Sequence, residues 1–396
     1  MTRRDLLAAS AAPLLLQAQA KPRVAAIVTE YRHWSHADVV VGRLLGGSSP
    51  NGRHRPHRCQ VVSLYAAQSP AGTDMVPDLA ARFGFTVYPT IAEALTLGGK
   101  QLAVDAVVFI GEHGNYPTND LGQKLYPRYE LFSQILDVYE QTGRSVPTFF
   151  DKHLSYSWEK AETMFKRARK LGFPFLLGSS IPVSVRFPEM DLPLGTPLSG
   201  AVAIAYGDPD AYGFHTIEAL QSIVERRRGG ETGIRRVDFK QGASAWEWMR
   251  QHHRPLWDAA WQRMPGTSGS LFDAAGRDAN PALFILEYRD GLTAGALITR
   301  LCEHWTVAVA PAAGAILSTR FGGPELKRPL PHFDGLVDCI EEMFITRQEP
   351  YPPERTLLTT GALAYGFAAK RAGGAVDTPA LAISYQVPPD VYRQRS

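Results

Sequence analysis

The chain has 396 residues, of which 45% are hydrophobic and 20% charged, with a formal net charge of +3 at pH 7. This is the composition of an ordinary globular protein long enough for two domains, and the nearly balanced charge argues against a nucleic-acid partner or an anionic membrane surface. Cys59, Cys302 and Cys339 are its only cysteines and have no C-x-x-C spacing, which argues against a disulfide framework and a cysteine zinc site.

The first twenty residues have the pattern of an export signal. Arg3 and Arg4 form a twin-arginine start, an apolar stretch follows over 6–16, and Ala18-Gln19-Ala20 matches an A-x-A cleavage site. The apolar stretch is shorter than the roughly 20 residues that span a bilayer, and no later segment is apolar for long enough. We therefore expect residues 1–20 to be a twin-arginine signal peptide, and the protein to be exported folded to the periplasm or beyond.

Residues 21–180 alternate between strand and helix patterns. Strands are expected at 23–28, 60–65, 86–88, 106–110, 146–150 and 175–177, and helices near 36–46, 77–83, from 91, at 129–141 and at 157–171. Such alternation is typical of a parallel sheet with helices on both faces. The sequence therefore predicts an α/β, Rossmann-like, doubly wound N-terminal domain over 21–180.

The pattern changes after Ser180. Strands are expected at 201–206, 282–289, 292–299, 306–310 and 315–320, and helices at 214–227 and 335–344. Asp290-Gly291 between two apolar runs is a strong hairpin signal. Residues 181–396 are thus predicted to form an α/β domain on a large, open, mostly antiparallel sheet, with irregular stretches at 262–280 and 346–356.

Polar residues follow three of the N-terminal strands. They are Thr29-Glu30-Tyr31, Gly111-Glu112-His113 and Asp151-Lys152-His153. Ligands of such sheets bind beyond the carboxyl ends of the strands, so these segments are the candidate site. The first of them opens the loop Thr29 to His36, which stands where a dinucleotide-binding domain has a glycine-rich turn.

Three segments in order carry a resemblance to a known family. They are Phe149-Phe150-Asp151-Lys152-His153 before a helix, then Arg186-Phe187-Pro188, then Tyr212-Gly213-Phe214-His215 opening a helix. With them the chain resembles the glucose–fructose oxidoreductase / inositol dehydrogenase family over nearly its whole mature length. The resemblance places Lys152 and His215 on the family's catalytic lysine and histidine.

The resemblance implies an NAD- or NADP-dependent oxidoreductase that acts on a sugar or polyol hydroxyl. His215 accepts the hydroxyl proton and Lys152 stabilises the developing alkoxide, with Asp151 as a third catalytic candidate. The cofactor-binding candidates are Thr29, Glu30, Tyr31, Glu112 and His113. In the family the open sheet of the second domain commonly packs against another subunit, so we also expect a homo-oligomer.

The sequence departs from the family pattern at four places. The Gly-x-Gly-x-x-Gly turn is absent, and the end of the second strand, Leu64 to Gln68, has neither an acid for a ribose nor an arginine for a 2′-phosphate. His153 replaces a proline. Ala211 replaces an aspartate, with Asp210 one position early. The first two departures concern the cofactor, and the last two concern the catalytic residues.

Two other functions remain open on the sequence alone. A metal-dependent hydrolase or lyase would use histidines and carboxylates at the strand ends to bind Zn²⁺, Mn²⁺ or Fe²⁺. The candidate ligands are His33, His36, Glu112, His113 and His153. A non-catalytic carbohydrate-binding protein would stack sugar rings on tryptophans. Trp246 and Trp248 alternate as in a strand, and Trp257 and Trp261 lie one helical turn apart. Packing in the core is the other interpretation of these four residues.

Overall fold

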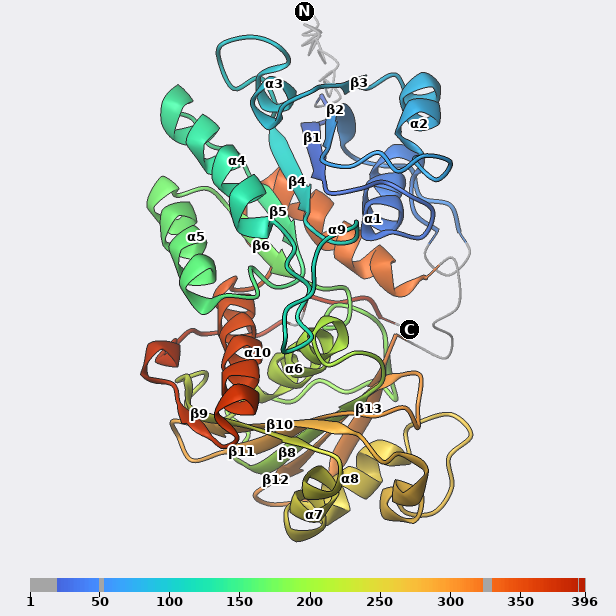
Figure 1. Ribbon diagram of the computed structural model, residues 1–396, viewed down its shortest axis with the longest axis vertical. Coiled ribbons are helices and arrows are strands. Elements are labelled where there is room, and N and C mark those ends of the chain that lie inside the picture. Colours follow the sequence, from blue (N-terminus) through green and yellow to red (C-terminus); the bar gives the residue numbers. More distant parts are fainter. Residues whose placement is uncertain (1–19, 50–52, 323–329, 391, 396) are drawn as a thin grey trace, which may run out of the picture.

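The computed structural model describes residues 20–49, 53–322, 330–390 and 392–395. The predicted signal peptide, apart from Ala20, lies outside the described residues. The rest forms two sheets, each layered between helices (Figure 1). Within the described ranges, no helix combines the length and apolarity that a membrane span requires.

The first sheet is parallel throughout and has the order β3-β2-β1-β4-β5-β6. Its strands are β1 (Arg23–Val28), β2 (Gln60–Ala66), β3 (Thr86–Val87), β4 (Ala106–Ile110), β5 (Thr148–Asp151) and β6 (Phe175–Gly178). The central strands β1 and β4 are apolar runs that are buried on both faces, as parallel strands between helices must be. The predicted doubly wound sheet is confirmed.

Helices cover both faces of this sheet. They are α1 (His36–Gly46), α2 (Val76–Phe83), α3 (Ile91–Thr96), α4 (Arg128–Thr142), α5 (Trp158–Leu171) and the much later α9 (His332–Thr346). Helices α3, α4 and α5 pack on one face, and α1 and α9 on the other. An ion pair of 2.6 Å between Arg43 and Asp334 joins α1 to α9. The domain boundary after residue 180 stays a prediction, since α9 belongs to the later part of the chain.

The second sheet has eight strands in the order β14-β9-β10-β11-β8-β12-β13-β7. They are β7 (Arg186–Phe187), β8 (Leu198–Ala205), β9 (Ile234–Gln241), β10 (Ala282–Tyr288), β11 (Thr293–Ile298), β12 (Trp305–Pro311), β13 (Leu317–Phe321) and β14 (Val376–Asp377). Among the described strands of this sheet only the β11–β8 pair is parallel, so the expected mostly antiparallel sheet is confirmed.

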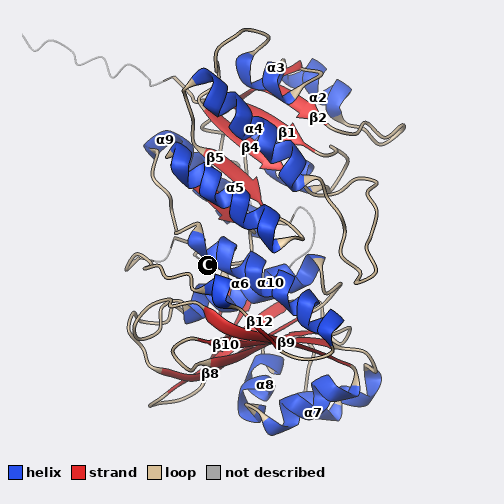
Figure 2. Cartoon of the chain, turned by 60° about the vertical axis from the view of Figure 1, so that its left-hand side comes forward, coloured by secondary structure: helices blue, strands red, loops and turns tan. Residues whose placement is uncertain are grey.

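Both faces of the second sheet are covered by the chain itself. Helices α6 (Ala211–Val224) and α10 (Glu354–Ala372) lie between the two sheets, and α7 (Ala243–Gln251) and α8 (Arg254–Trp261) lie on the far side (Figure 2). Trp246, Trp257 and Trp261 are buried against the far face. The oligomeric state itself stays a prediction.

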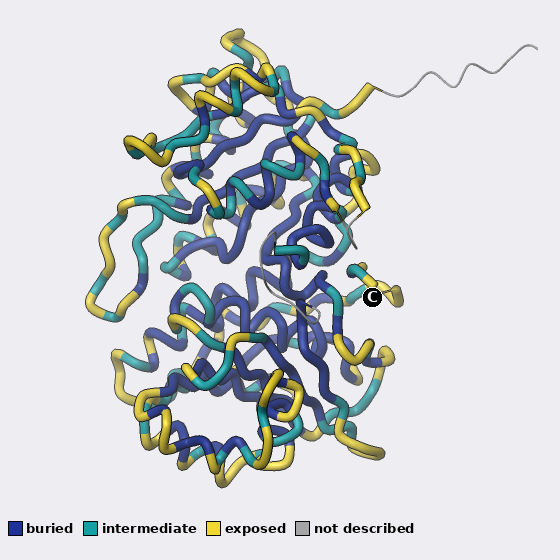
Figure 3. The backbone as a smooth tube through the Cα atoms, turned by 90° about the vertical axis from the view of Figure 1, so that its right-hand side faces the viewer, coloured by how far each residue is buried: buried dark blue, intermediate teal, exposed yellow. Residues whose placement is uncertain are grey.

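Three elements differ from the prediction. Trp246 and Trp248 lie in helix α7 and not in a strand. Strand β9 and helix α10 were not predicted, and α10 begins inside the stretch expected to be irregular. Helix α10 is packed between other elements, and its Gly361 permits this close packing, because a Cβ there would lie 2.3 Å from Leu381 Cδ2. Figure 3 shows the buried backbone concentrated in the sheets and in the helices between them.

Candidate active site

The polar strand ends meet at one edge of the first sheet. Strands β1, β4 and β5 are neighbours, so Thr29, Glu112 and the segment 151–153 follow them side by side. Helix α6 adds His215 from the second part of the chain, and helix α1 adds His36 as its first residue. The result is a buried cluster of polar side chains between the two layered units.

Lys152 is held by its backbone and by one carboxylate. Its φ of 63° lies in the left-handed region, and its N–H donates to the carbonyl of Gly178 at 3.0 Å. Its Nζ donates to Glu112 Oε1 at 3.0 Å, and the other oxygen of Glu112 accepts from Arg128. Burial alone would raise the pKa of Glu112, but the two cations hold it well below its usual range. An ionised Glu112 therefore orients the ammonium group.

His153 lies on the far side of the same network. Arg128 donates to its Nε2 at 2.8 Å. Burial, together with the positive charge of Arg128, lowers the pKa of His153 well below 6.5. The side chain is therefore a neutral acceptor that holds a buried arginine. His153, which stands where the family has a proline, therefore has a structural role in this chain.

His215 has an unused nitrogen in the pocket. The residue is 7% exposed and its Nδ1 has no hydrogen-bond partner among the described residues. Burial and the nearby Lys152 lower its pKa well below 6.5, so the imidazole is neutral. Its ring lies against Tyr212 and Trp305, with centroids 6.0 and 5.8 Å away. A neutral imidazole beside an ammonium group is able to accept a proton from a bound hydroxyl.

A second set of polar side chains surrounds the first turn. Asp151 is fully buried, and its Oδ2 lies 2.7 Å from His36 Nδ1. The rings of His36 and His113 are 5.2 Å apart. Burial lowers the pKa of His113 to about 3, with a further contribution from His36. His332, at the start of α9, has a pKa lowered to about 3 for the same reason.

Two of the three cofactor-binding candidates of the first turn have polar partners within the protein, and the third is buried in the apolar core. Thr29 Oγ1 donates to the carbonyl of Glu112 at 2.6 Å. Glu30 pairs with Arg32 at 2.7 Å. Tyr31 is fully buried beneath α1, and this burial raises the pKa of its phenol. These contacts build the turn, and none of the three side chains is left to bind a cofactor.

The N-terminus of helix α1 is also satisfied internally. Ser35 caps it by accepting from the N–H of Asp38 at 3.3 Å, and the Asp38 carboxylate accepts from the N–H of Trp34 at 2.8 Å. At the end of β2, the side chain of Gln68 bonds both the N–H and the carbonyl of Asn115. The places where a dinucleotide's phosphates and ribose lie in this type of fold thus hold the protein's own groups.

The predicted metal site is not supported. His33 is 66% exposed in its side chain and faces Asp38 at 3.4 Å, away from the pocket. Glu112 and His153 are engaged by cations, which excludes a metal ion from the same lone pairs. No group of three or more histidine, cysteine, aspartate or glutamate side chains in the described part of the chain has the geometry to hold a metal ion.

Glu218 follows His215 in α6 but makes its hydrogen bonds elsewhere. It accepts from the N–H and Oγ of Ser179 at 2.9 and 2.7 Å and from Thr356 at 3.0 Å. Burial raises its pKa to about 7. The residue joins the end of β6 to α6 and α10, so its role is structural.

Arg128 and His332 belong to the site but were not predicted. Arg128 follows an irregular stretch at the start of α4, and His332 comes from a helix 180 residues after Lys152. No local motif marks either residue. Their place depends on α4 and α9 packing against the first sheet, which only the assembled fold determines.

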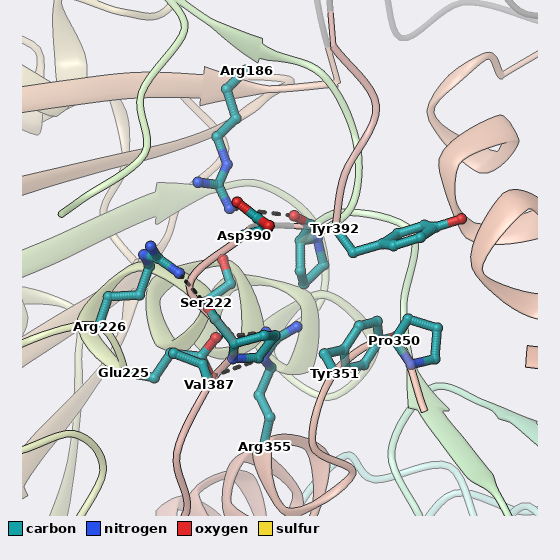
Figure 4. A pocket seen from close by; sticks show the side chains of 12 residues that line it. Arg186, Ser222, Glu225, Arg226, Pro350, Tyr351, Arg355, Val387, Asp390 and Tyr392 are labelled. Carbon is teal, nitrogen blue, oxygen red and sulfur yellow. Dashed lines mark hydrogen bonds and ion pairs between the residues drawn. The ribbon is translucent and has the colours of Figure 1, made fainter. Parts of the chain in front are cut away.

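A separate small cavity lies around Arg186, of the predicted Arg186-Phe187-Pro188 segment (Figure 4). It encloses about 20 Å³, room for about one water molecule. Arg186 donates there to the carbonyl of Met190 and to Asp191, and Arg355 pairs with Glu225. The cavity is too small for a sugar, and these arginines hold the chain together.

Comparison of the fold with solved structures finds dehydrogenases. The myo-inositol dehydrogenase of Lactobacillus casei, solved with NAD(H) and myo-inositol, matches with a TM-score of 0.57 and 13% identity, over 94% of this chain and 100% of that one. GenD2 from gentamicin A biosynthesis, solved with NAD, matches with a TM-score of 0.55 and 14% identity, over 90% and 96% of the two chains. This chain has the fold of the myo-inositol dehydrogenases.

A third similar structure is the myo-inositol dehydrogenase of Corynebacterium glutamicum, with a TM-score of 0.55 and 12% identity over 90% of this chain and 99% of that one. No family model matches the sequence. A search of curated proteins finds no match. At this level of identity the likeness concerns the fold, and it agrees with the resemblance found in the sequence.

Proposed function

We propose that the protein is an oxidoreductase-like enzyme that acts on a hydroxyl group of a sugar or polyol in the pocket of Lys152 and His215. The observation that carries the proposal is the buried His215, whose Nδ1 has no hydrogen-bond partner in the described part of the chain and whose pKa is lowered by burial and by the nearby Lys152. The dehydrogenase fold supports the substrate class, because solved structures of this fold include one with myo-inositol.

The residues themselves supply the proton chemistry. His215 Nδ1 accepts the proton of the substrate hydroxyl, and the oxygen keeps the electron pair. The Lys152 ammonium donates to that oxygen and stabilises its charge, while Glu112 at 3.0 Å holds the ammonium in place. The rings of Tyr212 and Trp305 exclude water from one side of His215. Asp151 contacts His36, so its part in the reaction is indirect.

We include NAD or NADP in the proposal as the hydride acceptor, because solved neighbours contain NAD. The first turn does not fit a dinucleotide in the pose usual for this fold. A pyrophosphate at the N-terminus of α1 would meet the Asp38 carboxylate and a helix end already capped by Ser35. The turn must therefore open before a dinucleotide enters.

This misfit favours a second candidate function, which is proton transfer without hydride transfer. A lyase or isomerase that acts on a sugar or polyol uses the same Lys152 and His215 and requires no dinucleotide. The metal-assisted form of this function is set aside, since the described side chains provide no metal site. The carbohydrate-binding function has less support, because Trp246, Trp257 and Trp261 are buried in the core and the partly buried Trp248 stacks on His252.

The experiment that separates the two candidates is native mass spectrometry of the folded protein, followed by a turnover screen. The screen offers a panel of polyols and sugars, including myo-inositol, with and without NAD or NADP. A bound nucleotide mass, or reduced nucleotide formed only with a polyol, supports the oxidoreductase. Product formed without any nucleotide supports the second candidate and contradicts the first.

Export by the twin-arginine route is a proposal that rests on residues 2–20 alone. Replacing Arg3→Lys and Arg4→Lys together is expected to retain the protein in the cytoplasm of a bacterial host. Cell fractionation measures this. Unchanged delivery to the periplasm would contradict the proposal.

A further inference from the structure

His36 and Asp151 form a hydrogen-bonded pair that the proposed reaction does not use. The two side chains come from α1 and β5, and His36 Nδ1 lies 2.7 Å from Asp151 Oδ2. Asp151 is fully buried and the His36 side chain is 14% exposed. Because an ionised carboxylate only accepts, Nδ1 is the donor and Nε2 of His36 is left as the basic nitrogen.

The free nitrogen belongs to the same pocket. Within the described part of the chain, His36 Nε2 makes no hydrogen bond. His36 contacts Asp151 and His113, which are the chain neighbours of Lys152 and Glu112. Its ring lies against Phe333 at 5.3 Å, an apolar contact that limits its rotation.

The pair stands at the position where this fold holds the phosphates of a dinucleotide. His36 is the first residue of α1, directly after the Ser35 cap. Phosphate binding at a helix N-terminus uses backbone N–H groups and does not require a histidine that is hydrogen-bonded to a carboxylate. The pair has the arrangement by which a carboxylate fixes the tautomer of a histidine and stabilises its charged form during proton transfer.

We propose that His36 is a second proton-transferring residue of the pocket and that Asp151 is its positioning residue. His36 Nε2 accepts the proton of a substrate hydroxyl other than the one that faces His215: the O–H bond breaks as the N–H bond forms, the oxygen keeps the electron pair, and the proton returns to that oxygen before the product leaves. Asp151 accepts the Nδ1–H throughout. The inference rests on the proposed function in one respect, namely that the polyol or sugar binds in the pocket of Lys152.

The test uses variants that separate structure from proton transfer. In His36→Asn the amide nitrogen still donates to Asp151 but no basic nitrogen remains, so the fold is kept and the proton acceptor is lost. We expect turnover of the panel polyol to fall about 100-fold or more, with an unchanged urea unfolding midpoint. Asp151→Asn is expected to lower turnover too, since the imidazole loses its fixed tautomer. Turnover by His36→Asn equal to that of the wild type would overturn the inference.

A second readout does not depend on turnover. Diethyl pyrocarbonate acylates neutral, accessible imidazole nitrogens, and peptide mapping reports each histidine separately. We expect His36 to react in the wild-type protein and to be protected by a panel polyol, whereas the exposed His33 reacts equally with and without it. Equal reaction of His36 with and without every polyol would overturn the inference. Protection of His36 together with normal turnover by Lys152→Ala would refute the proposed function and leave the inference standing.

Discussion

The two ends of the pocket differ in how they relate to the fold. At the β5–α6 end lie Lys152 and His215, which we propose bind a hydroxyl, and Glu112 contacts both Lys152 and Arg128. At the β1–α1 end, the turn that holds phosphate in other dinucleotide-binding domains is filled by its own cap and carboxylate. The two ends of one site can therefore differ in how closely they match the usual pattern of the fold. For this reason the β5–α6 end and the β1–α1 end are tested separately.

The largest expected effect is at the hydroxyl end. Replacing Glu112→Gln removes the charge that pairs with Lys152 and Arg128, both of which are buried. Breaking a buried ion pair from one side costs about 3–5 kcal/mol of unfolding free energy. Urea unfolding measures it, with Glu162→Gln on the surface of α5 as the matched control. A change below about 1 kcal/mol would show that the network does not support Lys152.

The histidines of the pocket are expected to make the protein sensitive to acid. The folded-state pKa of His113 and of His332 is lowered to about 3, so the unfolded chain binds protons below about pH 6.5 and the folded chain does not. Stability from each group is present above pH 6.5 and is lost as the pH falls toward 3. Each of the two histidines lowers the free energy of unfolding by about 2 kcal/mol when the pH falls from 7 to 5.

Other groups modify the size of this acid effect. His153 and His215 add to it in the same direction. Glu218, with a pKa raised to about 7, opposes it, because its contribution is lost as the pH rises. Urea unfolding at both pH values measures the sum, and His332→Gln is expected to reduce the loss by one histidine's share. An unchanged loss in that variant would contradict the assignment.

The capped first turn is expected to contribute to stability. Ser35→Ala removes the acceptor for the N–H of Asp38 and should cost about 1 kcal/mol. Ser157→Ala, at the start of α5, is the matched control at a helix outside the pocket and should cost a similar amount. If Ser35→Ala has no effect while Ser157→Ala does, the first turn is not the self-contained structure described above.

The smallest expected effect concerns the carboxylate at the phosphate end. Asp38→Ala removes a negative charge from the first turn of α1, where a dinucleotide phosphate would lie. We expect NAD to bind about 2- to 5-fold more tightly than to the wild type, since charges at a helix N-terminus contribute about 0.3–1 kcal/mol. Titration calorimetry measures this, with Asp78→Ala in α2 as the control. Weaker binding by Asp38→Ala would contradict the account of the misfit.

The sequence predicted much of the fold, because its signals are local. The apolar run of β4, the cap at Ser157 and the Asp290-Gly291 turn each identify an element by themselves. Helix α7 was missed because Trp246 and Trp248, two positions apart, imitate the alternation of a strand. Helix α10 was missed because it is buried on nearly all sides and so lacks the polar face of a surface helix.

The site was predictable only in part for a related reason. Strand ends concentrate polar residues, and this located Glu112, Lys152 and His36. Which of them contact each other depends on long-range packing: His153 pairs with Arg128, and Asp151 pairs with a histidine 115 positions away. The metal prediction failed at this step, because residues that share a sheet edge do not all point into the same space.

The most direct test of the account is a product analysis by NMR, which detects oxidised and rearranged products alike. The wild type, Lys152→Ala and the surface control Lys166→Ala are each incubated with the polyol and sugar panel, with and without NAD or NADP. The account predicts that the wild type and Lys166→Ala convert the same compound, whereas Lys152→Ala is slower by a factor on the order of 100 or more. Equal conversion by Lys152→Ala would contradict the claim that this end of the pocket binds and activates a hydroxyl.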